Sequence, residues 1–133
     1  MEKKFFKNLI AGNQSSPPTE VESSLVKQFA GAINIEWYKK EDDYEAIFYL
    51  HQMEHIARFK ITGELIEYKI NIPPTQLPPF IIETITTIGE IMSSVVINQL
   101  SKHHYEIIVR NKILQRLVVV LDDKGEILDR KFL

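Results

Sequence analysis

The sequence contains no cysteine among its 133 residues. That absence excludes disulfide bonds, thiolate zinc sites and cysteine nucleophiles. The chain also has no run that approaches the ~20 apolar residues of a membrane-spanning helix. Neither sign of charge dominates, because 16 Lys and Arg residues stand against 18 Asp and Glu, which gives a net charge of −2. A nucleic-acid-binding protein normally carries a basic surface, so this balance argues against nucleic acid as a partner.

The composition is that of one folded domain. Hydrophobic residues make up 44% of the chain and charged residues 26%, and 133 residues are enough to bury one substantial core. We expect an N-terminal segment and linker over residues 1–16, followed by a single domain over residues 17–133. The first residues lack the ~7–15-residue apolar stretch of a secretory signal. As written, the chain is therefore expected to be soluble and cytoplasmic.

Two helices and several strands are predicted from residue periodicity. The first helix opens at Thr19, which with Glu22 fits a capping box, and stops near Gly31. The second opens at Pro79 and stops between Gly89 and Met92. Alternating apolar and polar residues, together with β-branched runs, predict strands at 33–38, 44–50, 56–61, 64–72, 95–100, 105–110, 116–121 and 126–132.

The two halves of the chain carry the same landmarks in the same order. The distance from Pro18 to Tyr44 equals the distance from Pro79 to Tyr105, 26 positions in each case. Such an offset suggests an internal repeat. We therefore predict an α+β fold made of two tandem α-β-β-β repeats, residues 17–73 and 74–133, which share an antiparallel sheet with the helices on one face.

Several short motifs support a family resemblance through their order and spacing. They are Ile35-Glu36-Trp37, Tyr44-Glu45-Ala46, Leu77-Pro78 and Tyr105-Glu106. Together they resemble the PepSY-like, β-lactamase-inhibitor-protein-like (BLIP-like) domains of Bacteroidetes, over roughly residues 17–133. The resemblance implies helix-then-strand repeats, a periplasmic or exported location, and a regulatory or inhibitory binding role without catalytic residues. The chain departs from the resembled family at His51-Gln52, where members often carry Asn-Gly, and in the expected absence of their export signal.

No pattern of residues supports an enzyme. Ser93-Ser94 lacks the glycine-flanked elbow of a serine nucleophile, and the chain has no G-x-G-x-x-G motif. A metal site needs three or four convergent ligands. The histidines fall in predicted turns, where we expect them to be exposed to solvent: His51, His55, His103 and His104. We predict neither catalytic residues, nor a cofactor, nor a metal site.

The face of the sheet away from the helices is the predicted binding surface. Trp37, Phe48 and Phe59 are in phase with aliphatic residues and belong to the core. Tyrosine and isoleucine mixed with glutamate on the other face would suit contact with a protein or peptide, since tyrosine is enriched at interfaces. Alternatively, the N-terminal segment covers this face, or the face tolerates exposed apolar residues. The candidate binding residues are Glu36, Tyr38, Glu45, Ile47, Tyr49, Ile66 and Tyr68.

Two apolar stretches point to association. The run Leu117–Leu121 is apolar on both faces, so each side should be covered. The terminal residues Phe5, Phe6, Leu9 and Ile10 could dock on that strand, within one chain or across a dimer, or could be disordered. The leading prediction is a non-enzymatic binding or regulatory module. The alternatives are a self-associating homodimer and a small-ligand-binding domain.

Overall fold

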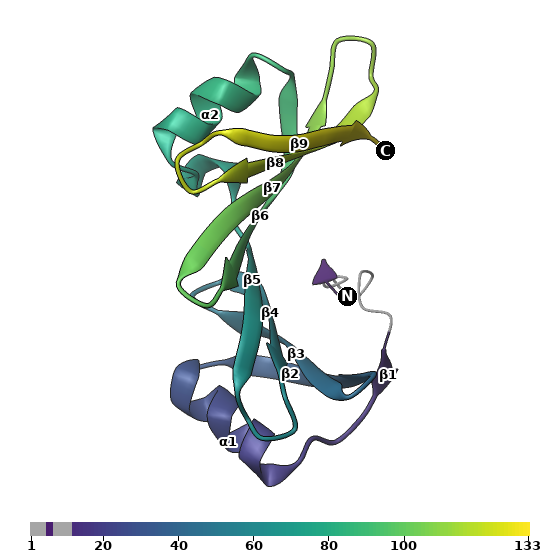
Figure 1. The fold of residues 1–133 in the computed structure, drawn as a ribbon, viewed down its shortest axis with the longest axis vertical. Coiled ribbons are helices and arrows are strands. Elements are labelled where there is room, and N and C mark those ends of the chain that lie inside the picture. The colour runs from purple at the N-terminus through teal and green to yellow at the C-terminus, as the bar shows by residue number, and fades with distance from the viewer. Residues whose placement is uncertain (1–4, 7–11) are drawn as a thin grey trace. The chain divides into compact units, whose positions relative to one another are not determined.

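The computed structural model describes residues 5–6 and 12–133. The chain forms two compact units, Met1–Ile70 and Asn71–Leu133. The strands follow one another through an antiparallel sheet in chain order, from β1 to β9 (Figure 1). Each unit contributes one α-helix, and each has a hydrophobic core of its own.

The first unit builds its core between one helix and the sheet. Val21 and Leu25 of the helix and Phe29 at its end pack onto Phe48 and Phe59 of two adjacent strands. Trp37 is partly buried against this cluster, so the three predicted core aromatics lie where the sequence suggested. The elements are β1 (Asn13–Gln14), α1 (Thr19–Gln28), β2 (Ile33–Lys40), β3 (Asp43–Leu50), β4 (Met53–Phe59) and β5 (Leu65–Asn71).

The second unit builds its core from aliphatic residues. Ile81 and Ile85 of its helix lie against Ile107, Val119 and Leu121 of two neighbouring strands. The intervening residues of the run 117–121 are half-buried on the other side of the sheet. The elements are the short 3-10 helix η2 (Pro74–Gln76), α2 (Pro79–Thr86), β6 (Glu90–Gln99), β7 (Lys102–Arg110), β8 (Arg116–Asp122) and β9 (Ile127–Phe132).

The predicted fold class is wrong. The chain is mainly a nine-strand antiparallel sheet with two short α-helices of 10 and 8 residues, not a balanced α+β fold of two α-β-β-β repeats. Four strands follow each α-helix, as the predicted strand positions already imply, so the three-strand unit of the predicted repeat is wrong. In the first unit, His51 and Gln52 both have positive φ, 52° and 65°, and close a two-residue hairpin between β3 and β4.

Helix boundaries also differ from the prediction. The N-cap of α1 is Pro18 and makes no side-chain hydrogen bond, so Thr19 is the first helical residue and the predicted capping box is wrong. The second helix ends at Thr86, before the predicted stop. It does not continue into β6, which begins at Glu90. The N–H groups of Ile88 and Gly89 both bond to the carbonyl of Ile85, which closes the helix one turn earlier.

Candidate functional site

One face of the first unit's sheet carries a set of paired polar and apolar side chains. Side chains alternate between the two faces of a strand. Ala46 and Phe48 of β3 pack into the α1 core, so the residues that alternate with them point to the opposite face. Their partners across the β3–β4 ladder share that face. The pairs are Glu45 with Arg58, Ile47 with Ile56 and Tyr49 with Glu54. We call this surface the Phe6 face.

Phe6 lies against this face and is only 1% exposed. Its main-chain N–H donates a hydrogen bond of 2.7 Å to Oε2 of Glu54. Its side chain lines a cavity of about 80 Å³. The other residues that line the cavity come from β2, β3, β4 and β5, namely Lys40, Glu45, Ile56, Arg58, Glu67 and Lys69. Of the alternatives for the N-terminal residues, the structure favours coverage of the sheet face for Phe6. Leu9 and Ile10 lie outside the described residues.

Glu54 is the polar centre of the Phe6 face. Glu54 is only 5% exposed, so its carboxylate has lost most of its contact with water. Burial of a charge is costly unless hydrogen bonds replace the lost water. Both oxygens have such a bond: Oε1 accepts the hydroxyl of Tyr49 at 2.8 Å, and Oε2 accepts the N–H of Phe6. One donor thus comes from the neighbouring strand and the other from a segment far away in sequence.

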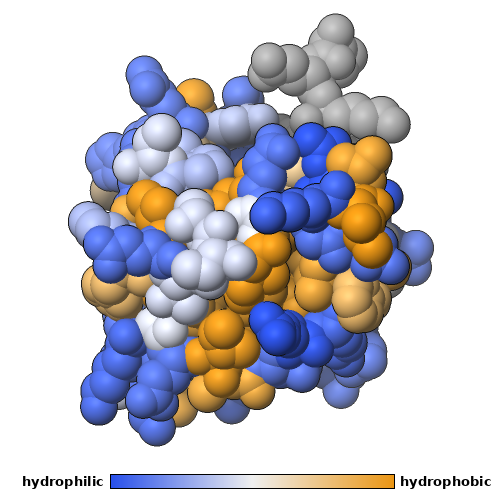
Figure 2. All heavy atoms as spheres, turned by 90° about the horizontal axis from the view of Figure 1, so that it is seen from above, coloured by the Kyte–Doolittle hydropathy of each residue, from blue (hydrophilic) through white to orange (hydrophobic). Residues whose placement is uncertain are grey.

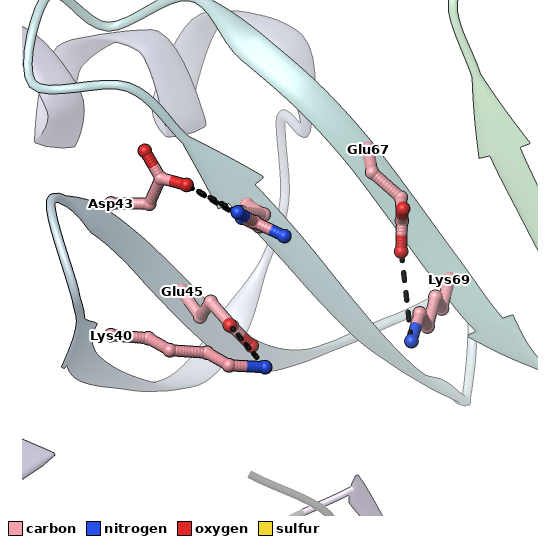
Figure 3. A network of polar contacts seen from close by, with 6 residues as sticks. Lys40, Asp43, Glu45, Glu67 and Lys69 are labelled. Atoms are coloured by element: carbon pink, nitrogen blue, oxygen red, sulfur yellow. Dashed lines mark hydrogen bonds and ion pairs between the residues drawn. The ribbon is translucent and has the colours of Figure 1, made fainter. Parts of the chain in front are cut away.

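Three ion pairs lie beside the cavity (Figure 3). Arg58 contacts Asp43 with its Nη2 at 2.6 Å and its Nε at 2.8 Å from Oδ2. The hydrogen bond that Arg58 donates to Asp43 is the main cause that raises the pKa of Arg58. The longer pairs are Lys40 with Glu45 at 3.7 Å and Lys69 with Glu67 at 3.6 Å. Cations and anions balance in these pairs, so the surroundings of the cavity do not select a strongly charged ligand.

Five of the seven predicted binding residues lie on the Phe6 face. Glu45, Ile47 and Tyr49 belong to β3, while Glu36 and Tyr38 of β2 lie opposite Ile47 and Glu45. Burial raises the pKa of Tyr38, and the charge and hydrogen bond of Glu36 raise it further. Tyr38 and Ile47 are buried, so this part of the face is not open to solvent.

The two predicted residues of β5 lie on the other side. Tyr68 packs against the α1 core, with its ring centroid 5.3 Å from that of Phe29. Ile66, two residues earlier, shares that side by alternation. Glu67 and Lys69 instead reach the cavity. Sequence reasoning thus identified the strand but assigned it the opposite phase.

Sequence reasoning also missed the two residues that meet at the centre of the site. Glu54 was not singled out, because nothing in its neighbours indicates a buried carboxylate. Phe6 was recognised only as part of an apolar patch. The signal that pointed to it was the pair Phe5-Phe6 ahead of a polar, proline-ended linker. Apolar side chains in such a position need a surface to cover them.

The histidines do not form a metal site in the part of the chain that the structure describes, where no group of three or more His, Cys, Asp or Glu could hold a metal ion. The expectation that all four are exposed is wrong for His55, which is 4% exposed. Its ring stacks on Phe48 at 5.3 Å, and its Nδ1 lies 3.0 Å from the carbonyl oxygen of Met53. Burial lowers the pKa of His55.

Comparison with known proteins gives matches among solved structures alone. No protein-family model and no curated protein matches the chain. A DUF2874 family protein from Bacteroides uniformis superposes with a TM-score of 0.79 at 15% identity, over 88% of this chain and 90% of that one. A BLIP-like protein from Bacteroides fragilis gives a TM-score of 0.78 at 15% identity, over 90% and 88%. These likenesses show a BLIP-like fold. They do not show a PepSY relationship or membership of one family.

A third neighbour shares the fold. It is a protein from Bacteroides eggerthii, provisionally described as periplasmic, with a TM-score of 0.79 at 16% identity over 89% of this chain and 90% of that one. Within residues 5–6 and 12–133, no helix is long and apolar enough to cross a membrane. Nothing in the fold supports the expected cytoplasmic location.

Proposed function

We propose that this chain is a non-enzymatic binding module whose Phe6 face recognises a protein or peptide segment that carries an aromatic side chain. The observation that supports it is the position of Phe6. The face packs against the aromatic side chain of Phe6, and the carboxylate of Glu54 accepts a hydrogen bond from the main-chain N–H of the same residue. A segment from another protein offers the same two groups, so the intrachain contact is a template for recognition.

The two contacts would contribute in different ways. Every residue except proline offers a main-chain N–H, so the bond to Glu54 would position a segment without selecting its sequence. Selection would come from the side chain that takes the place of Phe6 in the wall of the cavity, near Ile56 and the ion pairs of Lys40 and Arg58. This division between main-chain affinity and side-chain specificity is common in peptide recognition.

The cavity leaves little room for a free small molecule beside Phe6. With Phe6 in its wall, its volume is about 80 Å³, whereas small-molecule sites typically enclose about 300–1,000 Å³. The likeness to a BLIP-like protein supports protein recognition over catalysis, although a fold alone does not fix a function.

A peptide made from the chain's own residues 1–12 tests this proposal. The full chain with Phe6→Ala leaves the cavity without its aromatic side chain. A fluorescently labelled peptide with the native sequence Met1–Gly12 should bind to this variant in trans and raise the fluorescence anisotropy. It should bind the wild-type chain more weakly, because the native Phe6 competes for the same place.

Two matched controls make the result specific. A peptide with alanine in place of Phe6 should not bind the Phe6→Ala chain. Adding Glu54→Gln to that chain should weaken binding of the native peptide, because a hydrogen bond to a charged group contributes about 1.5–3 kcal/mol and a neutral acceptor contributes less. If the native and alanine peptides gave the same anisotropy curve, the proposed function would be wrong.

A further inference from the structure

The last strand of the sheet has an unoccupied edge. β9 pairs with β8 on one side, and it stands at the end of the strand order, with no partner on its other edge among the described strands. All six of its residues are exposed, including Leu128 at 61% and Phe132 at 63%. Figure 2 shows one face of the molecule, where hydrophobic side chains lie at the surface among hydrophilic ones. An exposed edge with apolar side chains is a template for pairing with another strand.

The β8–β9 ladder determines which main-chain groups the edge presents. The N–H of Leu133 donates to the carbonyl of Arg116 at 2.9 Å, so the main-chain groups of Leu133 are directed at β8. In an antiparallel ladder, alternate residues bond to the same neighbour. Asp129 and Lys131 therefore also face β8. Arg130 and Phe132 present their N–H and C=O groups to the free edge.

The charged side chains of β9 have no partner within the described chain. None of the ion pairs or hydrogen bonds of the side chains in residues 5–6 and 12–133 involves Asp129, Arg130 or Lys131. Along the strand, one acidic residue is followed by two basic ones. This order is self-complementary if the strand meets a copy of itself that runs in the opposite direction.

We propose that the chain forms a homodimer by antiparallel pairing of two β9 edges, centred on Arg130. Two-fold symmetry then places each interaction twice. Asp129 lies opposite Lys131 of the second copy, within the regular part of the strand, residues 129–132, which pairs with β8 without a register shift. The outward groups of Arg130 bond to those of Arg130 in the second copy, so the sheet continues across the axis. This inference does not depend on the function of the Phe6 face.

The charges select this register over its neighbours. Outward main-chain groups also meet if the copies slide by one two-residue step. One such step places Asp129 opposite its own copy, and the other does the same for Lys131. Like charges directly opposite each other destabilise a strand pair, and unlike charges stabilise it. The Arg130-centred register keeps one like-charge pair, Arg130 with Arg130 of the second copy. Both side chains are long and exposed, so their charged groups can separate in water.

Sedimentation over a concentration series, with charge-reversed variants, tests the dimer. The wild-type chain should shift from its 15.5 kDa mass toward twice that value as concentration rises. Asp129→Lys alone and Lys131→Asp alone should each raise the dimer dissociation constant by about tenfold, because each replaces two attractive pairs with repulsive ones. An equimolar mixture of the two variants should dimerise again, since unlike charges then meet at both sites.

The control and the opposing outcomes are equally specific. Lys112→Asp reverses an exposed charge in the β7–β8 turn of the same unit and should leave the dissociation constant unchanged. Circular dichroism of each variant verifies the fold. A wild-type mass that stays at 15.5 kDa would overturn the proposal and would mean that the charges of β9 protect the edge from pairing. A dimer that tolerates both reversals alone would also overturn it, because another surface would then hold the copies together.

Discussion

The hydroxyl of Tyr49 donates a hydrogen bond of 2.8 Å to Oε1 of Glu54. Tyr49 lies on β3 and Glu54 opposite it on β4, so the bond closes across the end of one hairpin. It holds the carboxylate of Glu54 in one orientation and leaves Oε2 directed at the N–H of Phe6. The acceptor that receives the N-terminal residue is therefore positioned by a side chain that does not contact that N–H.

The first prediction concerns this positioning bond. Tyr49→Phe removes the hydroxyl and leaves Glu54 with one fewer donor, which should lower the free energy of unfolding by about 1 kcal/mol. The amide of Phe6 should also exchange faster with solvent deuterium, because its acceptor is less well oriented. Hydrogen exchange measured by NMR reports both effects. Tyr44→Phe is the matched control, since the Tyr44 hydroxyl has no hydrogen bond to a described residue. Unchanged protection of the Phe6 amide in Tyr49→Phe would refute the positioning role.

The second prediction separates two adjacent aromatic residues. Phe6→Ala should lower the free energy of unfolding by about 1–3 kcal/mol, below the 3–5 kcal/mol of a core phenylalanine, because a terminal residue can undock while the sheet stays folded. Phe5 is half-buried, and its ring meets that of Phe6 edge-on with the ring centroids 5.2 Å apart. Phe5→Ala should therefore lower the free energy of unfolding by less than Phe6→Ala does. Urea unfolding followed by the fluorescence of Trp37, the single tryptophan, measures both. Equal losses in the two variants would contradict the burial of Phe6.

Faces of individual strands were predictable wherever alternation was unbroken. In β2 and β3, the period of two placed Glu36, Tyr38 and Tyr49 on one face and Trp37 on the other, as the register confirms. The phase of β5 was not predictable in this way. A shift of one residue moves every side chain of a strand to the other face, and the short turn before β5 does not fix that phase by composition. Tyr68 consequently lies under α1 instead of on the Phe6 face.

The contact at the centre of the site lay beyond sequence reasoning. Phe6 and Glu54 are separated by 48 positions, and their bond uses a main-chain donor that every non-proline residue carries. Glutamate is almost never fully buried unless it is paired, so its burial depends on partners that one sequence does not identify. The fold class failed for a different reason: the unit was taken as α-β-β-β, although residue alternation predicted four strands after each helix, and four are present.

The third prediction compares two glycine turns. Gly63 and Gly125 have φ of +93° and +89°, where an alanine is strained by about 1–3 kcal/mol. A Cβ on Gly63 would lie 2.8 Å from the main-chain oxygen of Glu20, which is fixed in α1. A Cβ on Gly125 would meet the ring of Phe80, which is 44% exposed and can move. Gly63→Ala should therefore lower the unfolding temperature more than Gly125→Ala in thermal scans by circular dichroism. The reverse order would show that α1 yields more easily than the Phe80 ring.

The fourth prediction concerns pH and His55. Burial lowers the pKa of His55 below its ordinary value of 6.5, with a smaller contribution in the same direction from His51, while the contact with the Met53 carbonyl opposes the shift. Between the folded and unfolded pKa values, the unfolded chain binds more protons than the folded one. The contribution of His55 to stability is therefore fully present above pH 6.5. It is lost as the pH drops from 6.5 toward the folded pKa, and it does not change further below that pKa.

A variant without the imidazole should remove this slope. His55→Phe retains a flat ring to stack on Phe48 and has no proton to gain, so its urea midpoint should vary less between about pH 7 and about pH 5 than that of the wild type. His51→Asn is the matched control, because asparagine tolerates the positive φ of this turn position. It should retain most of the slope, since burial of His55 is the larger cause of its shift and the charge of His51 the smaller one. A slope that survived in His55→Phe and vanished in His51→Asn would place the titrating group in the turn instead of the core.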